Sequence, residues 1–222
     1  MNSGYWRSPA DDEAMQDEHG FIWRAMLGTV DVELAEAKVL DVGCNRGGFL
    51  RMLVDRAGIG EGCGYDPAFA AVADARRLAG ARPLIFDVAE RVPSGWSGFD
   101  VAFSHEVLYL LGDLRAHAAS VLGALRPGGV YFAVTGVHAG SRLMAAWHAA
   151  NAAELHLPDL RDLDEVADGF ADAGFEVEVA RLRLGFVPVS AHRDGGDGRA
   201  TLMEWLDYYS DDKVMFRFAR PL

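Results

Sequence analysis

The stretch of residues 38–50, KVLDVGCNRGGFL, constrains the fold of this 222-residue chain more than any other. Residues 39–42 are largely apolar and partly β-branched, which is typical of a short buried strand. Residues 43–48 are rich in glycine, which tolerates unusual backbone angles, and residues 49–54 begin a helix. A strand that enters a tight glycine turn and opens a helix presents backbone N–H groups to a ligand. The stretch therefore predicts a nucleotide-type site, and residues farther along the chain decide how specific that prediction is.

Strands and helices alternate along the chain after this turn. We expect strands at residues 39–42, 62–66, 83–87, 99–104 and 130–135, separated by helices at 49–57, 68–78 and 114–125. The alternation predicts a parallel, doubly wound α/β sheet with helices on both faces. Helices are also expected at 11–27, 29–37, 141–154, 160–173 and 202–208, and strands at 175–184 and 213–219. Because the last two strands lack a full crossover, one of the seven is expected to run antiparallel at the edge.

The composition excludes several classes of partner. A net charge of −12 argues against nucleic acid, because phosphate binding needs a basic face. Cys44 and Cys63 provide neither a disulfide framework nor a zinc-binding spacing, which suits a reducing cytoplasm. No signal sequence and no apolar run of membrane-spanning length is present. We therefore expect a soluble cytoplasmic monomer or homodimer without a metal site.

Polar side chains stand where several expected strands end. Asp66 follows Gly43 by 23 residues, the distance at which an acidic residue reaches ribose hydroxyls. The alternative role for Asp66 is a helix cap ahead of Pro67. Asp87 ends the next strand, where it either caps a turn or contacts an adenine amino group. Because ligands bind at the carboxyl ends of such strands, this edge of the sheet is the predicted site.

The ordered segments VLDVGCNRGGFL, GYDP, FDVAE, FDVAFSHEVLYLL and LRPGGVYFAVTG resemble the class I methyltransferases that use S-adenosylmethionine. The likeness covers about residues 38–136, and LRPGG is typical of the small-molecule branch of that family. It implies a Rossmann-like α/β/α domain spanning residues 1–222, with an antiparallel last strand. On the same grounds, residues 1–37 would form an N-terminal helical cap and residues 137–160 a substrate-side cover.

The resemblance also implies roles for individual residues. The cradle for the methionine end of S-adenosylmethionine would comprise Asp41, Gly43, Cys44, Asn45 and Gly47. The ribose and adenine would meet Asp66, with Pro67 beside it, and Asp87 with the backbone of Val88, while the carbonyl of Ser104 would lie beside the methionine amino group. The family usually has glycine where this chain has Asn45, and asparagine tolerates left-handed angles better than most residues.

Catalytic residues are harder to assign from the sequence. Methyl transfer needs an in-line nucleophile and, for some acceptors, a base. His105 and His138 follow the fourth and fifth strands and titrate near neutral pH, so each is a candidate base, with a structural role as the alternative. Candidates for the acceptor pocket are Tyr5, Trp6, Glu106 and Tyr109, although simple packing explains Tyr109 nearly as well.

Three functions are compatible with these patterns. The leading one is transfer of a methyl group from S-adenosylmethionine to an oxygen or nitrogen of a small molecule. An NAD-dependent oxidoreductase is the second, but the turn lacks the G-x-G-x-x-G spacing, and Asp87 and LRPGG would have no role. A non-catalytic regulator that binds S-adenosylmethionine is the third, because no residue is compelling as a catalyst.

Overall fold

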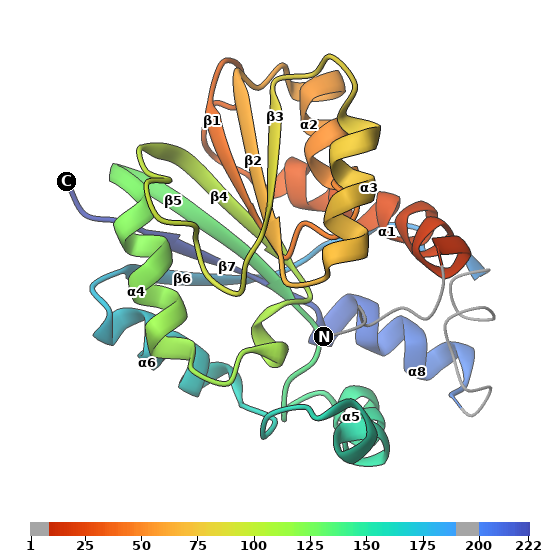
Figure 1. Ribbon diagram of the computed structural model, residues 1–222. Coiled ribbons are helices and arrows are strands. Elements are labelled where there is room, and N and C mark those ends of the chain that lie inside the picture. Colours follow the sequence, from red (N-terminus) through yellow and green to blue (C-terminus); the bar gives the residue numbers. More distant parts are fainter. Residues whose placement is uncertain (1–8, 190–199) are drawn as a thin grey trace.

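In the computed structural model, residues 9–189 and 200–222 are described, and they form a seven-stranded sheet of order β3-β2-β1-β4-β5-β7-β6 (Figure 1). The strands are β1 (Lys38–Val42), β2 (Glu61–Asp66), β3 (Leu84–Val88), β4 (Phe99–His105), β5 (Leu125–Thr135), β6 (Glu176–Arg181) and β7 (Val214–Ala219). β7 pairs antiparallel with both β5 and β6, and the pairs among β1 to β5 are parallel. The predicted mostly parallel sheet with one antiparallel strand is confirmed; that strand lies next to the edge strand β6.

Helices cover both faces of the sheet. One face carries α1 (Pro9–Thr29), α2 (Gly48–Ala57) and α3 (Phe69–Ala79), and the other carries α4 (Leu114–Ala124) and α6 (Leu163–Asp172). α5 (Arg142–Leu155) and α8 (Leu202–Asp207) lie beyond the carboxyl ends of the central strands (Figure 1). This is the three-layer α/β/α architecture expected from the alternation of strands and helices.

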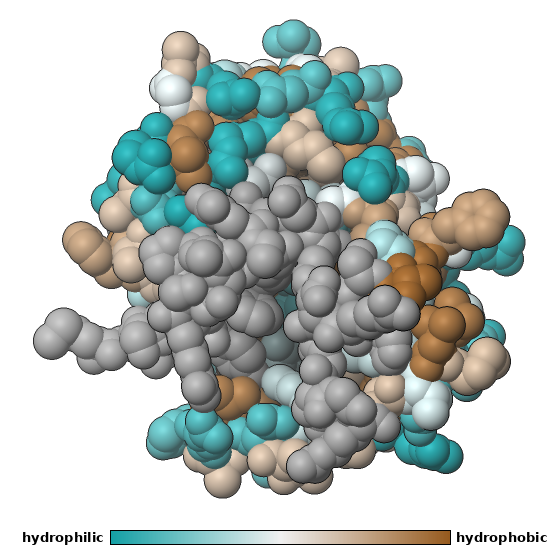
Figure 2. Space-filling model, turned by 90° about the vertical axis from the view of Figure 1, so that its right-hand side faces the viewer, coloured by the Kyte–Doolittle hydropathy of each residue, from teal (hydrophilic) through white to brown (hydrophobic). Residues whose placement is uncertain are grey.

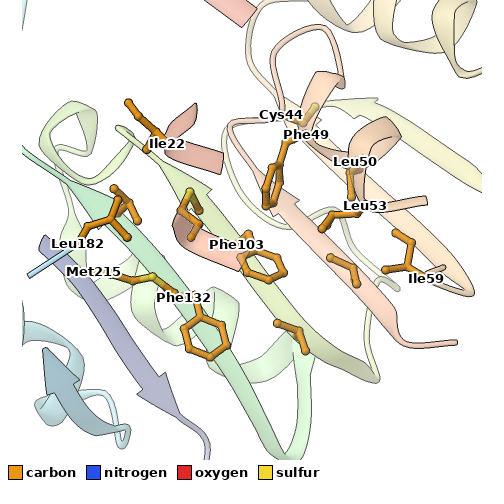
Figure 3. Packing of buried hydrophobic residues seen from close by; sticks show 14 of the residues in the cluster. Ile22, Cys44, Phe49, Leu50, Leu53, Ile59, Phe103, Phe132, Leu182 and Met215 are labelled. Atoms are coloured by element: carbon orange, nitrogen blue, oxygen red, sulfur yellow. The ribbon is translucent and has the colours of Figure 1, made fainter. Parts of the chain in front are cut away.

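The core on the α1–α3 face is aromatic at its centre. Phe103 of β4 stacks on Phe132 of β5 with ring centroids 5.7 Å apart, and Phe49 of α2 meets Phe103 edge-on at 5.2 Å (Figure 3). Because side chains alternate along a strand, His105 points to the same face as Phe103, and Ser104 points to the α4–α6 face. The pleat of β4 therefore separates two neighbouring polar residues onto opposite sides of the sheet.

The helix expected at residues 29–37 is wrong. α1 continues to Thr29, and residues 30–37 form bends and turns. The Glu33 carboxylate accepts the N–H groups of Leu34 and Ala35 at 3.2 and 3.1 Å, and Glu36 adopts a positive φ of 60°. A side chain that satisfies nearby backbone donors competes with helix formation, which explains the irregular path.

Two other segments differ in detail from the expected elements. β5 begins at Leu125, so the RPGG sequence lies inside the strand instead of before it. After α8, residues Tyr208–Asp212 form a π-helical turn, η2, directly ahead of β7. Such turns occur often at functional sites.

The face of the molecule that bears α1, α3 and α8 mixes hydrophilic side chains with a group of apolar ones at one edge (Figure 2). Among the helices of the described residues, none combines the length and apolar character needed to cross a membrane.

Candidate functional site

The glycine turn between β1 and α2 is pinned between two neighbouring segments. Gly43, Asn45 and Gly47 all have positive φ, at 71°, 45° and 72°. A Cβ atom on Gly47 would lie 2.5 Å from Cζ of Phe86 in β3, and one on Gly43 would lie 2.5 Å from a methyl group of Val107. Only glycine fits at these two positions, whereas asparagine is accommodated at position 45. The turn is thus a close-packed cradle at the carboxyl end of β1.

Asp66 organises this cradle. Its Oδ2 accepts the N–H of Asn45 at 3.0 Å, and its Oδ1 accepts the N–H of Ala68 at 2.8 Å. The second bond closes a turn and is not the helix cap considered as an alternative, because the N-cap of α3 is Ala68. The first bond joins the end of β2 to the glycine turn. A carboxylate has about four acceptor positions, so both oxygens retain lone pairs for a ligand.

Asp41 is a buried carboxyl group beneath the same turn. It is 5% exposed, and within residues 9–189 and 200–222 no hydrogen bond to its side chain is present. Burial raises its pKa well above the ordinary value, and the negative charge of Asp66 raises it further. Burial also raises the pKa of Asp66. Two acidic groups that raise the cost of ionising each other favour a positively charged ligand group near them.

Arg46 is a feature of the cradle that the sequence did not reveal. Its side chain is only 3% exposed, and its Nη2 lies 3.0 Å from Oδ2 of Asp74 in α3. This ion pair fastens the turn to the neighbouring helix. The signal that could have found it was an arginine inside a glycine-rich turn.

The two groups predicted to meet adenine lie together at the end of β3. Oδ1 of Asp87 accepts the N–H of Val88 at 2.9 Å and pairs with Arg76 of α3 at 3.2 Å. The Asp87 side chain is half exposed. An adenine contact for these residues stays a prediction.

Ser104 and Cys44 place their side chains away from open ligand space. The Ser104 hydroxyl is 2.7 Å from the hydroxyl of Tyr131, which also lies 3.3 Å from Nε2 of His117, all on the α4–α6 face. The Cys44 thiol is buried, and burial raises its pKa strongly. Because the Ser104 hydroxyl is engaged with Tyr131, a contact of Ser104 with the cofactor would involve its backbone. The backbone carbonyl is the group predicted to make that contact. Pro67 lies between Asp66 and Ala68, just before α3.

His105 lies at the end of β4 against a histidine of α1. The ring centroids of His105 and His19 are 4.6 Å apart, and the rings are nearly perpendicular at 81°. Burial, reinforced by His19 and Lys213, holds the pKa of His105 well below its ordinary value. Nε2 of His105 is buried and has no hydrogen-bonding partner among the residues that the structure describes. The ring is therefore neutral near pH 7, and its surroundings make it a weak base.

Glu106 takes part in a buried ion pair. Its backbone has a positive φ of 56°, and its carboxylate pairs with Lys213, which is only 2% exposed. The carboxylate also accepts the N–H of Gly136, at 3.0 and 3.2 Å, and the hydroxyl of Tyr208 at 3.4 Å. Sequence reasoning assigned Glu106 to the acceptor pocket and did not identify Lys213, although this is one of only two lysines in the chain.

The remaining predicted residues lie farther along the same edge. His138 is 5% exposed, and its Nε2 bonds to the carbonyl of Asp212 at 2.8 Å, which ties the segment after β5 to η2. Tyr109 lies in the short helix η1 (Leu108–Leu110), and its ring meets Trp147 of α5 edge-on at 6.1 Å. Tyr5 and Trp6 lie outside the described residues.

Relatives of the chain were found by sequence and by structure. A malonyl-[acyl-carrier protein] O-methyltransferase of Legionella pneumophila is 26% identical over 168 residues, which is 71% of this chain and 58% of that protein. A tRNA U34 carboxymethyltransferase of Methylococcus capsulatus is 36% identical over 113 residues, which is 48% of this chain and 34% of that protein. The chain thus spans about a third to three fifths of the length of these two relatives.

Solved structures share the fold. A chain in the complex between the Haloferax volcanii Trm112 methyltransferase activator and a methyltransferase superposes with a TM-score of 0.86 at 22% identity, with 100% of both chains covered. Other structures with this fold contain S-adenosyl-L-methionine or S-adenosyl-L-homocysteine. The family model for the methyltransferase domain matches residues 16–179. The chain therefore belongs to the methyltransferase-domain family, and it has the fold of the class I methyltransferases.

Proposed function

We propose that this methyltransferase acts on a nitrogen or oxygen atom of a small-molecule acceptor. We further propose that Asp41, Gly43, Cys44, Asn45 and Gly47 cradle the methionine end of the cofactor. Asp66 and Pro67 would lie along the ribose, Asp87 and Val88 along the adenine, and the Ser104 carbonyl beside the amino group. S-adenosylmethionine, when bound, supplies an activated methyl group on a positively charged sulfur.

The buried carboxyl group of Asp41 beside Asp66 carries this assignment. The methionine end of S-adenosylmethionine has an ammonium group and a sulfonium, and each lowers the cost of ionising the two acids. The dinucleotide NAD would instead bring a negatively charged pyrophosphate to the glycine turn, against the same two carboxyl groups. The charge of the cradle therefore supports S-adenosylmethionine over NAD.

The groups on the acceptor side support a small, largely apolar substrate. Glu106 and Lys213 neutralise each other, and the edge-on pair of Tyr109 and Trp147 offers aromatic surface. The net charge of −12 disfavours a polyanion such as tRNA. The two relatives are a malonyl-[acyl-carrier protein] O-methyltransferase and a tRNA U34 carboxymethyltransferase, so the acceptor class needs its own test.

Isothermal titration with S-adenosylhomocysteine tests the cofactor site. We expect Asp66→Asn to weaken binding about tenfold or more, since it removes the charge and one strong acceptor. Asp168→Asn, an exposed position on α6, is the control and should leave binding unchanged. Failure of the wild-type protein to bind would refute the proposed site.

Transfer of a labelled methyl group to extracts separated by size tests the acceptor class. We expect label in the low-mass fraction and none on RNA or protein. Label confined to a macromolecular fraction would refute the small-molecule proposal. Tight cofactor binding without transfer to any fraction would favour a non-catalytic regulator.

A further inference from the structure

His19 of α1 lies against His105, the candidate base at the end of β4. The two imidazoles meet edge to face, with centroids 4.6 Å apart. His19 belongs to α1, whereas His105 follows Phe103 on the α1–α3 face of the sheet. Burial lowers the pKa of His19 to about 4. Both rings are therefore uncharged at neutral pH.

The surroundings of the two rings hold them in this neutral form. The charged groups that act on them are Lys213, just before β7, and Glu106, just after β4. Lys213 opposes protonation of both rings, and Glu106 favours protonation of His19. Because Lys213 and Glu106 form an ion pair with each other, neither is available to carry an acceptor proton.

Nε2 of His105 is the unsatisfied atom of the cluster. It is withdrawn from solvent, and no group within residues 9–189 and 200–222 forms a hydrogen bond with it. A buried polar atom without a partner is unfavourable, so an unpaired atom at a ligand-binding edge of the sheet calls for a partner supplied by a ligand. In the neutral tautomer that carries its hydrogen on Nδ1, Nε2 accepts a hydrogen bond, and the matching ligand group is a donor.

We propose that His105 Nε2 receives the proton of the methyl acceptor and that His19 is the positioning residue that orients the His105 ring. This inference rests on the proposed function, and it narrows the acceptor to a hydroxyl. Methylation of a hydroxyl gives a strongly acidic oxonium, whose proton passes even to a weakly basic imidazole, whereas a methylated amine would keep its proton. The bond between sulfur and methyl breaks with its electrons left on sulfur. The acceptor lone pair forms the new bond to the methyl carbon, and the acceptor proton passes to His105, which later releases it to water.

Sinefungin is a suitable probe because the acceptor is unidentified. This analogue carries an amine where S-adenosylmethionine carries its methyl group, so its N–H groups point toward the acceptor position. The measurement is the ratio of the dissociation constants of S-adenosylhomocysteine and sinefungin. We expect His105→Phe to lower this ratio about tenfold, and His156→Asn, an exposed left-handed position at the end of α5, to leave it unchanged.

Nuclear magnetic resonance of the imidazole nitrogens separates positioning from packing. His19→Phe keeps an aromatic ring against His105, so a pure packing role predicts no change. We expect instead that the pKa of His105 rises, because His19 opposes its protonation. The ratio of the dissociation constants of S-adenosylhomocysteine and sinefungin should also fall. In the wild-type protein, sinefungin should shift the Nε2 resonance of His105, and S-adenosylhomocysteine should not.

An unchanged ratio in His105→Phe would overturn the proposal, as would equal Nε2 shifts with both ligands. If His105→Phe does not fold, the wild-type resonance comparison decides alone. Wild-type behaviour of His19→Phe in both measurements would reject its positioning role. Failure of the wild-type protein to bind S-adenosylhomocysteine would instead refute the cofactor site, so the two failures are distinguishable.

Discussion

Removing either partner of the Glu106–Lys213 ion pair should destabilise the protein strongly. Lys213 is 2% exposed, and the Glu106 side chain is 16% exposed. Breaking a buried pair leaves an uncompensated charge, which costs roughly 3–5 kcal/mol, whereas an exposed pair contributes about 1 kcal/mol or less. The location of this pair therefore predicts a large effect from a single substitution.

The contacts left behind indicate which substitution costs more. In Lys213→Met, the carboxylate keeps the N–H of Gly136 and the hydroxyl of Tyr208, so a loss of about 3 kcal/mol is expected. In Glu106→Leu, the buried ammonium loses its carboxylate acceptor, and Nζ remains 4.9 Å from the ring centroid of Tyr208, so about 5 kcal/mol is expected. For a chain of this size, these losses lower Tm by about 6–20 °C.

A double-mutant cycle provides the decisive measurement. Urea unfolding of the wild type, both single variants and the double variant gives the coupling free energy, which should be about 2–3 kcal/mol because the double variant leaves no unpaired charge. Arg115→Gln breaks the exposed pair with Asp172 and is the control, with about 1 kcal/mol or less expected. Additive single effects, or single effects no larger than the control, would show that the two side chains do not form a buried, coupled pair.

Three further predictions concern other parts of the site and core. Asp41→Asn should raise the Tm of the ligand-free protein, because the folded state then lacks a carboxyl group whose pKa is raised. The same substitution should weaken the binding of S-adenosylhomocysteine in calorimetry. A lower Tm would contradict this reasoning. Gly47→Ala should cost roughly 1–3 kcal/mol in urea unfolding through its positive φ and the ring of Phe86, while Gly112→Ala, with open space around it, should cost little. Burial lowers the pKa of His117 to about 4, so between pH 6.5 and 4 the unfolded chain binds a proton that the folded chain does not. The free energy of unfolding should therefore fall as the pH drops through this range, by roughly 3 kcal/mol for this group. His117→Gln should flatten that decline, and an unchanged slope would contradict the shift.

Local patterns in the sequence predicted much of the fold. Short apolar runs bounded by glycine and proline located each of the seven strands, because burial and turn chemistry act over a few neighbouring residues. The same local logic located the glycine turn and Asp66, since a left-handed backbone and an acidic residue at a strand end can be recognised from the sequence. It failed at residues 30–37, where the Glu33 side chain takes the backbone donors that a helix would use.

The partners across the site were decided only by the tertiary structure. Lys213 and Glu106 are 107 residues apart in the chain. They meet because β7 lies between β5 and β6 and runs antiparallel to β5, so that the first residues of β7 lie beside the last residues of β5 and close to the end of β4. His19 meets His105 because α1 packs on the face of the sheet toward which His105 points. A residue's type and neighbours determine local conformation and approximate burial, so the sequence by itself determined the strands, the cradle and the family. Which distant side chain completes each buried charge or ring depends on strand order and helix packing, which no local pattern contains.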